Sequence, residues 1–458
     1  MDEYIYLHQI FRGCIIISKE KMKRILIGDL GRFIDERVFV AGWVHAIRNQ
    51  KKMQFLIIRD HTGLVQVVHA RKDSDDPIAK AIDGLTTESA VEVVGKVIEN
   101  SQVKLGQKEI LVEEFVVDNL SESSIPITEE TALEGRMDWR FLDLRRPANF
   151  LVFQVQTTAE YAMRSFWQEN GFIEMHSPKF MGGASESGAE LFEVKYFDRK
   201  AYLAQSPQFY KQMAMSAGFD KVFEIGPVFR ANPSFTSRHD TEFTSIDVEI
   251  SWVKSHEDVM QFEESWLKYV LEKVKEKHGE AIKQMFGVEI TVPKIPFPRV
   301  SMAEAYKILK ENFDYTVARE GKGDLDPEGE RLLAKYILEK FGHDFIFVTD
   351  YPTSVRPFYH MRNAENPEIT NSFDLIWKGL EVTTGAQREH RHEILVKQVI
   401  EKGINPKSIQ YYLDFFKYGC PPHGGYGFGL TRMLMVMLGF KNVREVTYLY
   451  RGPNRLSP

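Results

Sequence analysis

Five short runs of β-branched and aromatic residues, between about residues 30 and 118, constrain the fold of this chain most strongly. The runs cover residues 38–44, 55–58, 64–68, 91–94 and 110–117. Turn-forming segments such as residues 60–63 (DHTG) separate them, and a helical stretch near residues 76–85 follows the third run. Five strands with a helix after the third are typical of an OB barrel. Because this fold commonly binds single-stranded nucleic acid, a nucleic-acid-binding domain is the first hypothesis.

The rest of the sequence is long enough for further domains, because 458 residues exceed an ordinary domain of about 100–200 residues. A polar connector follows at residues 119–140, and an amphipathic helix is predicted from Asn149 to Gln168. Alternating Glu and Lys predict a solvated amphipathic helix at residues 256–278. Strands and helices mix throughout, which predicts an α+β fold. The expected domains are an N-terminal extension at 1–29, the barrel at 30–118, a linker at 119–140 and a large domain at 141–458.

The composition excludes several classes of protein. The formal net charge of −6 argues against a polycation that coats nucleic acid or a membrane, although it leaves room for a local basic surface. Cys14 and Cys420 have no CxxC or Cys/His spacing, which excludes a disulfide framework and a structural zinc site and favours a reducing cytoplasm. No run of eighteen apolar residues occurs, so no transmembrane helix is expected. An acidic beginning argues against a secretory signal, and Met22 is a plausible alternative start.

Two clusters in the large domain carry residue types that suit a nucleotide. One joins residues 229–232 (FRAN) to residues 238–243 (RHDTEF). Arginine binds phosphate oxygens in a bidentate manner and a phenyl ring stacks on a purine, whereas the alternative is a hairpin with surface salt bridges. The other cluster is residues 427–432 (GFGLTR), whose glycines permit close backbone approach. A single glycine-rich turn is weak support for a nucleotide site, and no P-loop is present.

Two further clusters extend this set. Residues 171–178 (GFIEMHSP) indicate by themselves only a helix that runs into a strand. Residues 372–375 (SFDL) and 379–388 (GLEVTTGAQR) predict two strands that bring Asp374 and Glu381 within reach of one hard cation such as Mg²⁺. The alternative for these two carboxylates is a solvated strand edge.

Together the four clusters resemble the three signature motifs of class II aminoacyl-tRNA synthetases, in the order and spacing of that class. Four segments are similar, more narrowly, to aspartyl-tRNA synthetases of the archaeal and eukaryotic kind. They are residues 205–212 (QSPQFYKQ), 238–243 (RHDTEF), 385–388 (GAQR) and 421–425 (PPHGG). The similarity runs from about residue 30 to Pro458.

The resemblance implies an OB-fold anticodon-binding domain followed by a six-stranded antiparallel catalytic sheet with helices. It implies that ATP activates L-aspartate to aspartyl-adenylate and that the aspartyl group passes to the 3′ end of tRNA-Asp. The substrate carboxylate is the nucleophile in such a reaction, so no protein nucleophile is needed. Catalysis then consists of positioning and charge stabilisation, which fits a set of arginines and carboxylates.

The resemblance also assigns roles to single residues. Arg230 would hold the α-phosphate, His239 would assist at the γ-phosphate and Arg432 would bind the far end of the triphosphate, and these three form the predicted catalytic set. The predicted ATP-binding residues are Arg230, Arg238, His239, Phe243 (stacked on adenine), Glu381 and Arg432. The predicted Mg²⁺ ligands are Asp374, Glu381 and the Thr384 hydroxyl.

An aspartate pocket follows from the same resemblance. Its predicted members are Glu186, Gln208, Lys211, Asp247, Thr384 and Arg388. Lys211 and Arg388 would face the side-chain carboxylate, and an amide would leave these cations unpaired, so asparagine would be rejected. Lys211 follows Gln208 by three residues on one helical face, which favours the site over a helix-surface lysine.

For the barrel, the resemblance implies that Phe55 stacks on an anticodon base and that Gln66 and Glu109 contact base edges. Without it, Phe55 would be interpreted as a core residue. His45 occupies a place where tryptophan accompanies strict tRNA-Asp specificity and histidine accompanies relaxed versions. We therefore hypothesise that tRNA-Asn is charged as well, with an amidotransferase acting on the product. The segment around residues 171–178 would form a homodimer interface.

Some positions depart from the pattern of the family. Asn232 and Thr431 each stand where glutamate is usual, and Thr384 replaces serine. Residues 450–453 (YRGP) stand where PRDP is common, and the insertion domain of the usual bacterial enzyme is missing, which suggests a second bacterial copy of the archaeal-type enzyme. Three alternatives remain open. They are an asparaginyl-tRNA synthetase, a non-catalytic RNA-binding paralogue, and an asparagine synthetase relative, which would lack the barrel.

Overall fold

The computed structural model describes residues 22–183, 190–233, 236–318 and 323–458. Most of the predicted N-terminal extension and Glu186 therefore lie outside the described residues. The chain divides into two compact units, Met1–Pro147 and Ala148–Pro458. Within the described ranges, no helix is long and apolar enough to cross a membrane.

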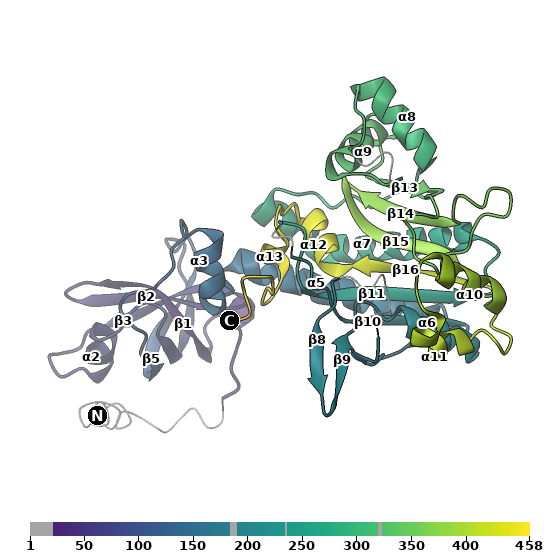
Figure 1. The fold of residues 1–458 in the computed structure, drawn as a ribbon. Coiled ribbons are helices and arrows are strands. Elements are labelled where there is room, and N and C mark those ends of the chain that lie inside the picture. Colours follow the sequence, from purple (N-terminus) through teal and green to yellow (C-terminus); the bar gives the residue numbers. More distant parts are fainter. Residues whose placement is uncertain (1–21, 184–189, 234–235, 319–322) are drawn as a thin grey trace. The chain divides into compact units, whose positions relative to one another are not determined.

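The first unit contains a closed five-stranded barrel in the order β1-β2-β3-β5-β4 (Figure 1). Its strands are β1 (Arg37–Asn49), β2 (Met53–Asp60), β3 (Gly63–Ala70), β4 (Ala90–Glu99) and β5 (Lys108–Asn119). Only β3 and β5 pair in parallel, and the other neighbours are antiparallel. Helix α2 (Pro77–Asp83) follows β3, so the predicted OB barrel is confirmed in strand number and helix position.

Alternation along the strands explains why this sequence closes into a barrel. Successive side chains of a strand point to opposite faces, and the fully buried Leu56, Ile58, Val65 and Val67 fill the interior from β2 and β3. Asp76 caps α2 by accepting hydrogen bonds from two backbone amides of its first turn. The unit also contains η2 (Ile27–Arg32), α3 (Leu133–Asp138) and α4 (Arg140–Asp143), the last two within or just beyond the expected linker.

The second unit is built on an eight-stranded sheet in the order β12-β13-β14-β15-β16-β11-β10-β6. Its strands are β6 (Ile173–Glu174), β10 (Lys221–Phe229), β11 (Glu242–Ser251), β12 (Arg299–Ser301), β13 (Phe345–Thr349), β14 (Ser372–Trp377), β15 (Leu380–Arg388) and β16 (His423–Gly429). The six inner strands are antiparallel, as the resemblance implied, but β12 and β6 add one parallel strand at each edge. A small separate sheet contains β7 (Phe180–Met181), β8 (Glu193–Tyr196) and β9 (Arg199–Leu203).

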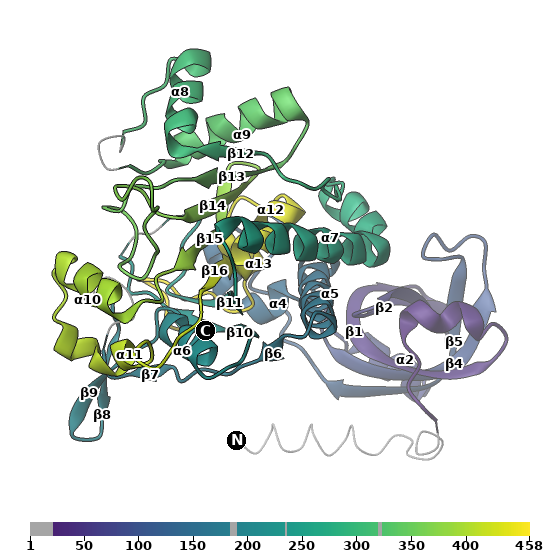
Figure 2. The same ribbon diagram turned by 90° about the vertical axis from the view of Figure 1, so that its right-hand side faces the viewer.

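One face of the large sheet carries the main hydrophobic core. Ile246 and Val248 of β11 and Tyr426 and Phe428 of β16 point into it. Four helices contribute to this core, namely α5 (Pro147–Glu169), α7 (His256–Phe286), α12 (Leu430–Leu438) and the short α13 (Val443–Val446). Figure 2 shows α7 lying along β15 and β16. The predicted amphipathic helix is confirmed, because one side of α7 is solvated and the other is packed on the sheet.

The remaining helices cover other parts of the sheet. Helices α8 (Met302–Phe313) and α9 (Pro327–Phe341) pack near β12 and β13, with Ile346, Val348 and Ile376 of the sheet in their shared core (Figure 1). Helix α6 (Gln208–Ser216) contacts β10 and β11. The last helical segments are α10 (His392–Glu401), η4 (Pro406–Ile409), α11 (Gln410–Asp414) and α13 (Val443–Val446). The opposite face of β11, β15 and β16 is left for polar side chains.

A buried carboxyl on α7 yields a test of the core. Glu263 is fully buried, accepts a hydrogen bond of 2.6 Å from the Thr383 hydroxyl, and burial raises its pKa to about 8. The folded protein therefore holds this proton at neutral pH, whereas the unfolded chain releases it above its ordinary value of 4.5. Glu263 thus lowers stability as the pH rises from about 4.5 to about 8, by up to about 1.4 kcal/mol per pH unit.

We expect Glu263→Gln to remove this dependence. We measure the thermal unfolding midpoint at pH 5, 6, 7 and 8. The midpoint of the variant minus that of the wild type should increase as the pH rises. Glu276→Gln, an exposed change on the same helix, is the control, and its difference in unfolding midpoint from the wild type should not increase with pH. A constant difference between Glu263→Gln and the wild type across this range would mean that Glu263 is ionised in the folded protein.

Candidate functional site

A cavity of about 350 Å³ lies on the polar face of the large sheet. Its walls come from β11, β15 and β16, from the residues that follow β10, from the first turns of α6 and α12 and from residues 356–360. On β16 the cavity is lined by Gly427, Phe428 and Gly429, and the Tyr426 side chain points to the core. A Cβ atom on Gly425 would lie 2.0 Å from the Val248 carbonyl oxygen and 2.3 Å from Glu249 Oε2. Only glycine therefore lets β16 pass this close to the charged side chains of β11.

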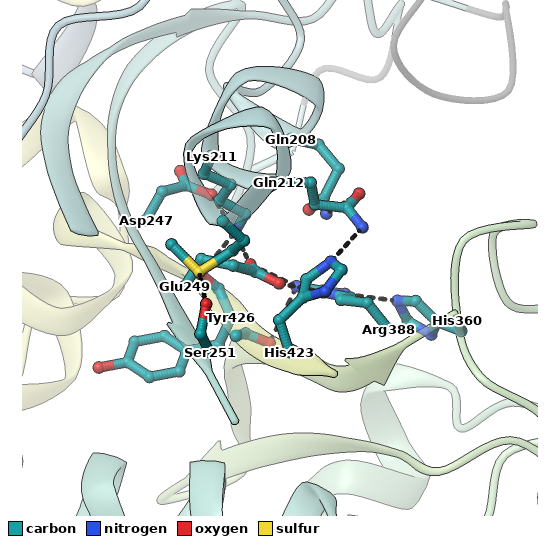
Figure 3. A network of polar contacts seen from close by, with 12 residues as sticks. Gln208, Lys211, Gln212, Asp247, Glu249, Ser251, His360, Arg388, His423 and Tyr426 are labelled. Atoms are coloured by element: carbon teal, nitrogen blue, oxygen red, sulfur yellow. Dashed lines mark hydrogen bonds and ion pairs between the residues drawn. The ribbon is translucent and has the colours of Figure 1, made fainter. Parts of the chain in front are cut away.

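A layer of four buried ions, Lys211, Asp247, Glu249 and Arg388, forms the floor of one end of the cavity (Figure 3). Lys211 Nζ lies 2.8 Å from Asp247 Oδ1 and 3.5 Å from Glu249 Oε2, and it donates to the Tyr426 carbonyl at 2.9 Å. Arg388 Nε donates to Glu249 Oε1 at 3.0 Å, and Nη2 donates to the Gly425 carbonyl at 2.9 Å. Two cations and two carboxylates thus balance one another in this layer.

Neutral polar groups surround the ion layer. Gln208 donates to Gln212 at 2.8 Å, and Gln212 Nε2 lies 2.9 Å from His423 Nε2 (Figure 3). Burial lowers the pKa of His423 to about 4, so this ring is uncharged at neutral pH. Gln208 lines the cavity, whereas Gln212 and His423 support it from behind.

The other end of the cavity gathers the residues predicted to bind the nucleotide. Arg230 directly follows β10, and its guanidinium lies 5.5 Å from the ring centre of Phe243 on β11. Arg432 Nη1 donates to the Glu381 carbonyl at 2.8 Å and lies 3.7 Å from Glu381 Oε1. His239 also lines the cavity, and burial together with nearby Arg432 lowers its pKa, so it is uncharged at neutral pH. These side chains offer cations and an aromatic face to a phosphorylated purine.

Two carboxyl groups at this end were not predicted from the sequence. Burial raises the pKa of Asp240 to about 7, against the opposing charges of Arg432 and Arg230, and Asp240 Oδ2 has no hydrogen-bond partner among the described residues. Glu330 of α9 lies 3.4 Å from Arg238 and accepts a hydrogen bond from the Glu381 amide, and burial raises its pKa to about 7. Their signal in the sequence was weak, because both belong to runs of charged residues.

The predicted magnesium ligands are close together, but they are not equally exposed to the cavity. Thr384 and Glu381 line it, and the Thr384 hydroxyl donates to Glu381 Oε1 at 3.2 Å. Asp374, on the neighbouring strand, is buried and forms an ion pair of 2.7 Å with Arg356. Burial and the charge of Asp374 raise the pKa of Glu381, which is the response expected of two adjacent carboxylates.

This donor set fits a magnesium ion only with help from a substrate. Asp374 Oδ1 is buried and has no hydrogen-bond partner among the described residues, which leaves it available to a cation. No group of three or more His, Cys, Asp or Glu side chains that would hold a metal occurs in the described ranges. Mg²⁺ is commonly bound by one or two carboxylates together with substrate phosphates. Glu381, Thr384 and Asp374 match that arrangement.

A second candidate site lies on the outer face of the barrel. Phe55, Gln66 and Glu109 alternate with inward-facing residues, so Phe55 is a half-buried surface residue rather than a core residue. Arg48 lies over the Phe55 ring at 4.7 Å, and Gln66 donates to Glu109 at 2.6 Å. An aromatic ring beside hydrogen-bonding groups suits an unstacked base.

His45 occupies a separate part of β1. The pairing of β1 with β2 shifts register between Val44 and Ala46, so His45 is the extra residue of a β-bulge and is exposed. Its Nδ1 lies 3.4 Å from Arg59 Nη1, and Arg59 pairs with Glu88 at 2.8 Å. Bulges re-aim side chains near functional sites.

The predicted site residues of the second unit thus fall into three sets. The residues that line the cavity are Gln208, Arg230, Arg238, His239, Phe243, Asp247, Glu381, Thr384, Arg388 and Arg432. Lys211 and Asp374 lie behind the lining, and Glu186 is outside the described residues. The sequence analysis missed Glu249, Arg356 and His360. Glu249 follows Asp247 at the two-residue spacing of a strand, which was a usable signal, whereas Arg356 and His360 lie in irregular chain.

Comparison with known proteins identifies both units. A family model for class II tRNA synthetases (D, K and N) matches residues 132–451, and one for the OB-fold nucleic acid binding domain matches residues 38–118. The aspartate–tRNA(Asp) ligase of Thermococcus kodakarensis is 43% identical over 427 residues, which are 92% of this chain and 96% of that protein. The aspartate–tRNA(Asp/Asn) ligase of Aeropyrum pernix is 40% identical over 455 residues, 98% of this chain and 99% of that protein.

Solved structures agree with this result. A structure described as an aspartyl-tRNA synthetase from Leishmania major Friedlin has a TM-score of 0.88 at 28% identity, and it covers 99% of this chain and 100% of that chain. Asparaginyl-tRNA synthetase from Pyrococcus horikoshii, complexed with asparaginyl-adenylate, has a TM-score of 0.87 at 32% identity, covering 95% and 100%. The fold is therefore shared by enzymes named for two different amino acids. The chain belongs to the class II aminoacyl-tRNA synthetases, in the group of the D, K and N enzymes.

Proposed function

We propose that this synthetase is an aspartate–tRNA ligase, which activates L-aspartate with ATP and transfers the aspartyl group to tRNA. The proposal that the amino acid is aspartate rests on the contacts of Arg388. Its guanidinium lines the cavity, and four of its five N–H groups are used by Glu249, Gly425 and His360. The remaining Nη1 hydrogen has no partner in the described part of the chain. A substrate carboxylate accepts from such a donor, and relatives at 40–43% identity carry the name aspartate–tRNA ligase.

The ion layer changes how aspartate recognition is explained. Lys211 and Arg388 are not surplus charges, because Asp247 and Glu249 already pair with them. The α-ammonium group of the substrate would bind Asp247, which lines the cavity, and this would release part of the Lys211 charge toward the side-chain carboxylate. Selectivity then depends on the arrangement of the layer. Asparagine would turn an amide N–H toward a donor and leave the remaining Nη1 hydrogen of Arg388 without an acceptor in a buried site, which costs affinity.

The chemistry at the nucleotide end needs positioning rather than a protein nucleophile. The α-carboxylate of aspartate would attack the α-phosphorus, the bond to the β-phosphate would break, and pyrophosphate would leave. Arg230 would stabilise charge at the α-phosphate, and Arg432, with Arg238 and His239, would hold the distal phosphates. Bound Mg²⁺, held by Glu381, Thr384 and Asp374, would supply positive charge to the phosphate oxygens.

The tRNA would be recognised by the barrel. Phe55 would stack on an anticodon base, and Gln66 and Glu109 would contact base edges. We infer that both tRNA-Asp and tRNA-Asn are charged, because His45 is exposed on a bulge next to Arg59 and the relatives named above include both a tRNA(Asp) and a tRNA(Asp/Asn) enzyme. Aspartyl-tRNA-Asn would then require an amidotransferase. A homodimer is expected through the region of β6, where Ile173 is half exposed.

The choice of amino acid is tested by ATP–pyrophosphate exchange with the wild-type protein. We expect aspartate to support exchange at least about 100-fold more efficiently than asparagine, because the buried donors of the site are left unpaired by the amide. Arg230→Ala should abolish exchange and serves as the catalytic control. Equal or better exchange with asparagine would contradict the proposal and favour the asparaginyl alternative.

The titration of Asp240 predicts that the KM for ATP depends on pH. Asp240 is neutral below about pH 7 and ionised above it, where it offsets Arg230 and Arg432 and repels the triphosphate. The KM for ATP, measured by exchange at saturating aspartate, should therefore rise about three- to tenfold between pH 6 and pH 8. Asp240→Asn should flatten this rise, whereas the exposed Asp198→Asn should not. If the KM for ATP varies with pH in the same way in the wild type and in Asp240→Asn, Asp240 does not affect ATP binding.

The barrel predicts an effect on tRNA alone. Phe55→Ala should raise the KM for tRNA about 5- to 100-fold, since stacking contributes about 1–3 kcal/mol per base. ATP–pyrophosphate exchange, which needs no tRNA, should be unchanged. The exposed Leu120→Ala is the matched control. Charging assays on purified tRNA-Asp and tRNA-Asn provide the measurement, and absence of charging on tRNA-Asn would refute dual specificity while leaving aspartate activation intact.

A further inference from the structure

We propose that His360 is a positioning residue for Arg388: it is a neutral hydrogen-bond acceptor that fixes the guanidinium without neutralising its charge, and so leaves that charge to the carboxylate side chain of the amino-acid substrate. The inference rests on the proposed function and deepens it. His360 lies in the irregular segment between β13 and β14, and its backbone forms an isolated bridge with Arg388 at the end of β15. Its side chain is buried and lines the cavity.

The contact between the two side chains determines the state of the imidazole. His360 Nε2 lies 3.0 Å from Arg388 Nη1 (Figure 3). A guanidinium has only N–H groups and stays protonated, so it must be the donor. Nε2 must therefore be the acceptor, and the single ring proton must lie on Nδ1. A protonated ring would place an N–H group against an N–H group.

The surroundings of His360 agree with a neutral ring. Burial, followed by the charges of Arg388, Arg356 and Lys211, lowers the pKa of His360 well below its ordinary value. Nδ1 is buried and has no partner among the described residues, so no group on that side of the ring selects the tautomer. Arg388 alone selects it. A buried N–H without a partner costs on the order of 1–3 kcal/mol. The contact of Nε2 with Arg388 must offset this cost for the Nδ1–H tautomer.

The charges around Arg388 explain why a neutral acceptor is needed. Glu249 already contributes a full negative charge to the guanidinium, at 3.0 Å from Nε. A second carboxylate at position 360 would place two negative charges beside Arg388. No positive charge of the guanidinium would then remain to attract a substrate carboxylate. An apolar side chain would leave Nη1 free to move and its hydrogens unpaired. A neutral imidazole acceptor avoids both outcomes and orients the remaining Nη1 hydrogen.

Three substitutions separate acceptor ability from charge. Gln at position 360 keeps a neutral acceptor, Leu removes the acceptor, and Glu adds a charged one. In ATP–pyrophosphate exchange, we expect His360→Gln to keep the KM for aspartate within about threefold of wild type. His360→Leu should raise it about tenfold, as loss of a hydrogen bond to a charged group implies, with the KM for ATP unchanged. His360→Glu should raise it at least about 100-fold and reduce the preference for aspartate over asparagine.

His278 provides a matched control. It is also buried, it contacts the Thr158 hydroxyl at 2.8 Å from Nε2, and it lies in α7 outside the cavity. His278→Leu should leave the KM for aspartate unchanged. The proposal is overturned if His360→Leu raises both KM values equally, if it has no effect, or if His360→Glu behaves like His360→Gln.

A second measurement needs no substrate and no change in activity. In a spectrum of ¹⁵N-histidine-labelled protein, the signals that disappear in His360→Gln belong to His360. We expect Nδ1 to be protonated and Nε2 to be the unprotonated acceptor from pH 6 to pH 8. The opposite tautomer, or a doubly protonated ring, would overturn the proposal even if His360→Leu and His360→Glu fold poorly. If the wild type fails to activate aspartate but this tautomer is found, the proposed function fails and the contact with Arg388 stands.

Discussion

The paired burial of Lys211, Asp247, Glu249 and Arg388 is the interaction on which the catalytic unit depends. Transfer of one such ion into the interior costs on the order of several kcal/mol, and it is offset only when partners and additional hydrogen bonds are in place. Here each cation contacts a carboxylate and a backbone carbonyl of β16. The layer therefore ties α6, β11, β15 and β16 together at one place. The absence of a side chain at Gly425 is a requirement of this layer, because a Cβ atom there would occupy the position of the Glu249 carboxylate.

The same layer explains how a site can be charged and selective at once. Its cations and carboxylates balance before a substrate arrives, so in the proposed function an amino acid is recognised by how well its own charges replace existing contacts. His360 and His423 add polar atoms at this end without adding charge, because burial keeps both rings neutral. At the other end, Asp240 and Glu330 stay close to their titration points at neutral pH. The amino-acid end is therefore electrostatically fixed, and the nucleotide end is adjustable.

The sequence predicted those features that repeat with a regular period. The barrel strands were predicted because they are short β-branched runs separated by turn residues, and α7 because Glu and Lys alternate around apolar residues. The six inner strands of the sheet were expected only from the resemblance, and β13 and β14 are buried along their whole length. The edge strand β12 was missed because its three residues are too few for a periodic pattern. The other edge strand, β6, lies in the helix–strand junction expected at residues 171–178. Phe55 was ambiguous for a related reason, since an aromatic residue in a short apolar run fits either face of a strand until the register is known.

Motif spacing placed most of the candidate site but could not assign its contacts. The sequence favoured a site-facing Lys211, and the structure buries this side chain behind the cavity wall, against Asp247 and Glu249 of a distant strand. The sequence likewise does not show that Asp374 pairs with Arg356, because the two residues lie in different segments of the chain. Arg356 and His360 occupy an irregular segment whose path is set by tertiary contacts, so no local pattern predicts that it returns to Arg388.

The central claim is that this fold activates aspartate. The most direct measurement is the mass of the small molecule that remains bound after the protein is incubated with ATP, Mg²⁺ and an equimolar mixture of the twenty amino acids, without tRNA. The account predicts aspartyl-adenylate as the dominant species. Asparaginyl-adenylate as the main product, or no adenylate at all, would contradict it.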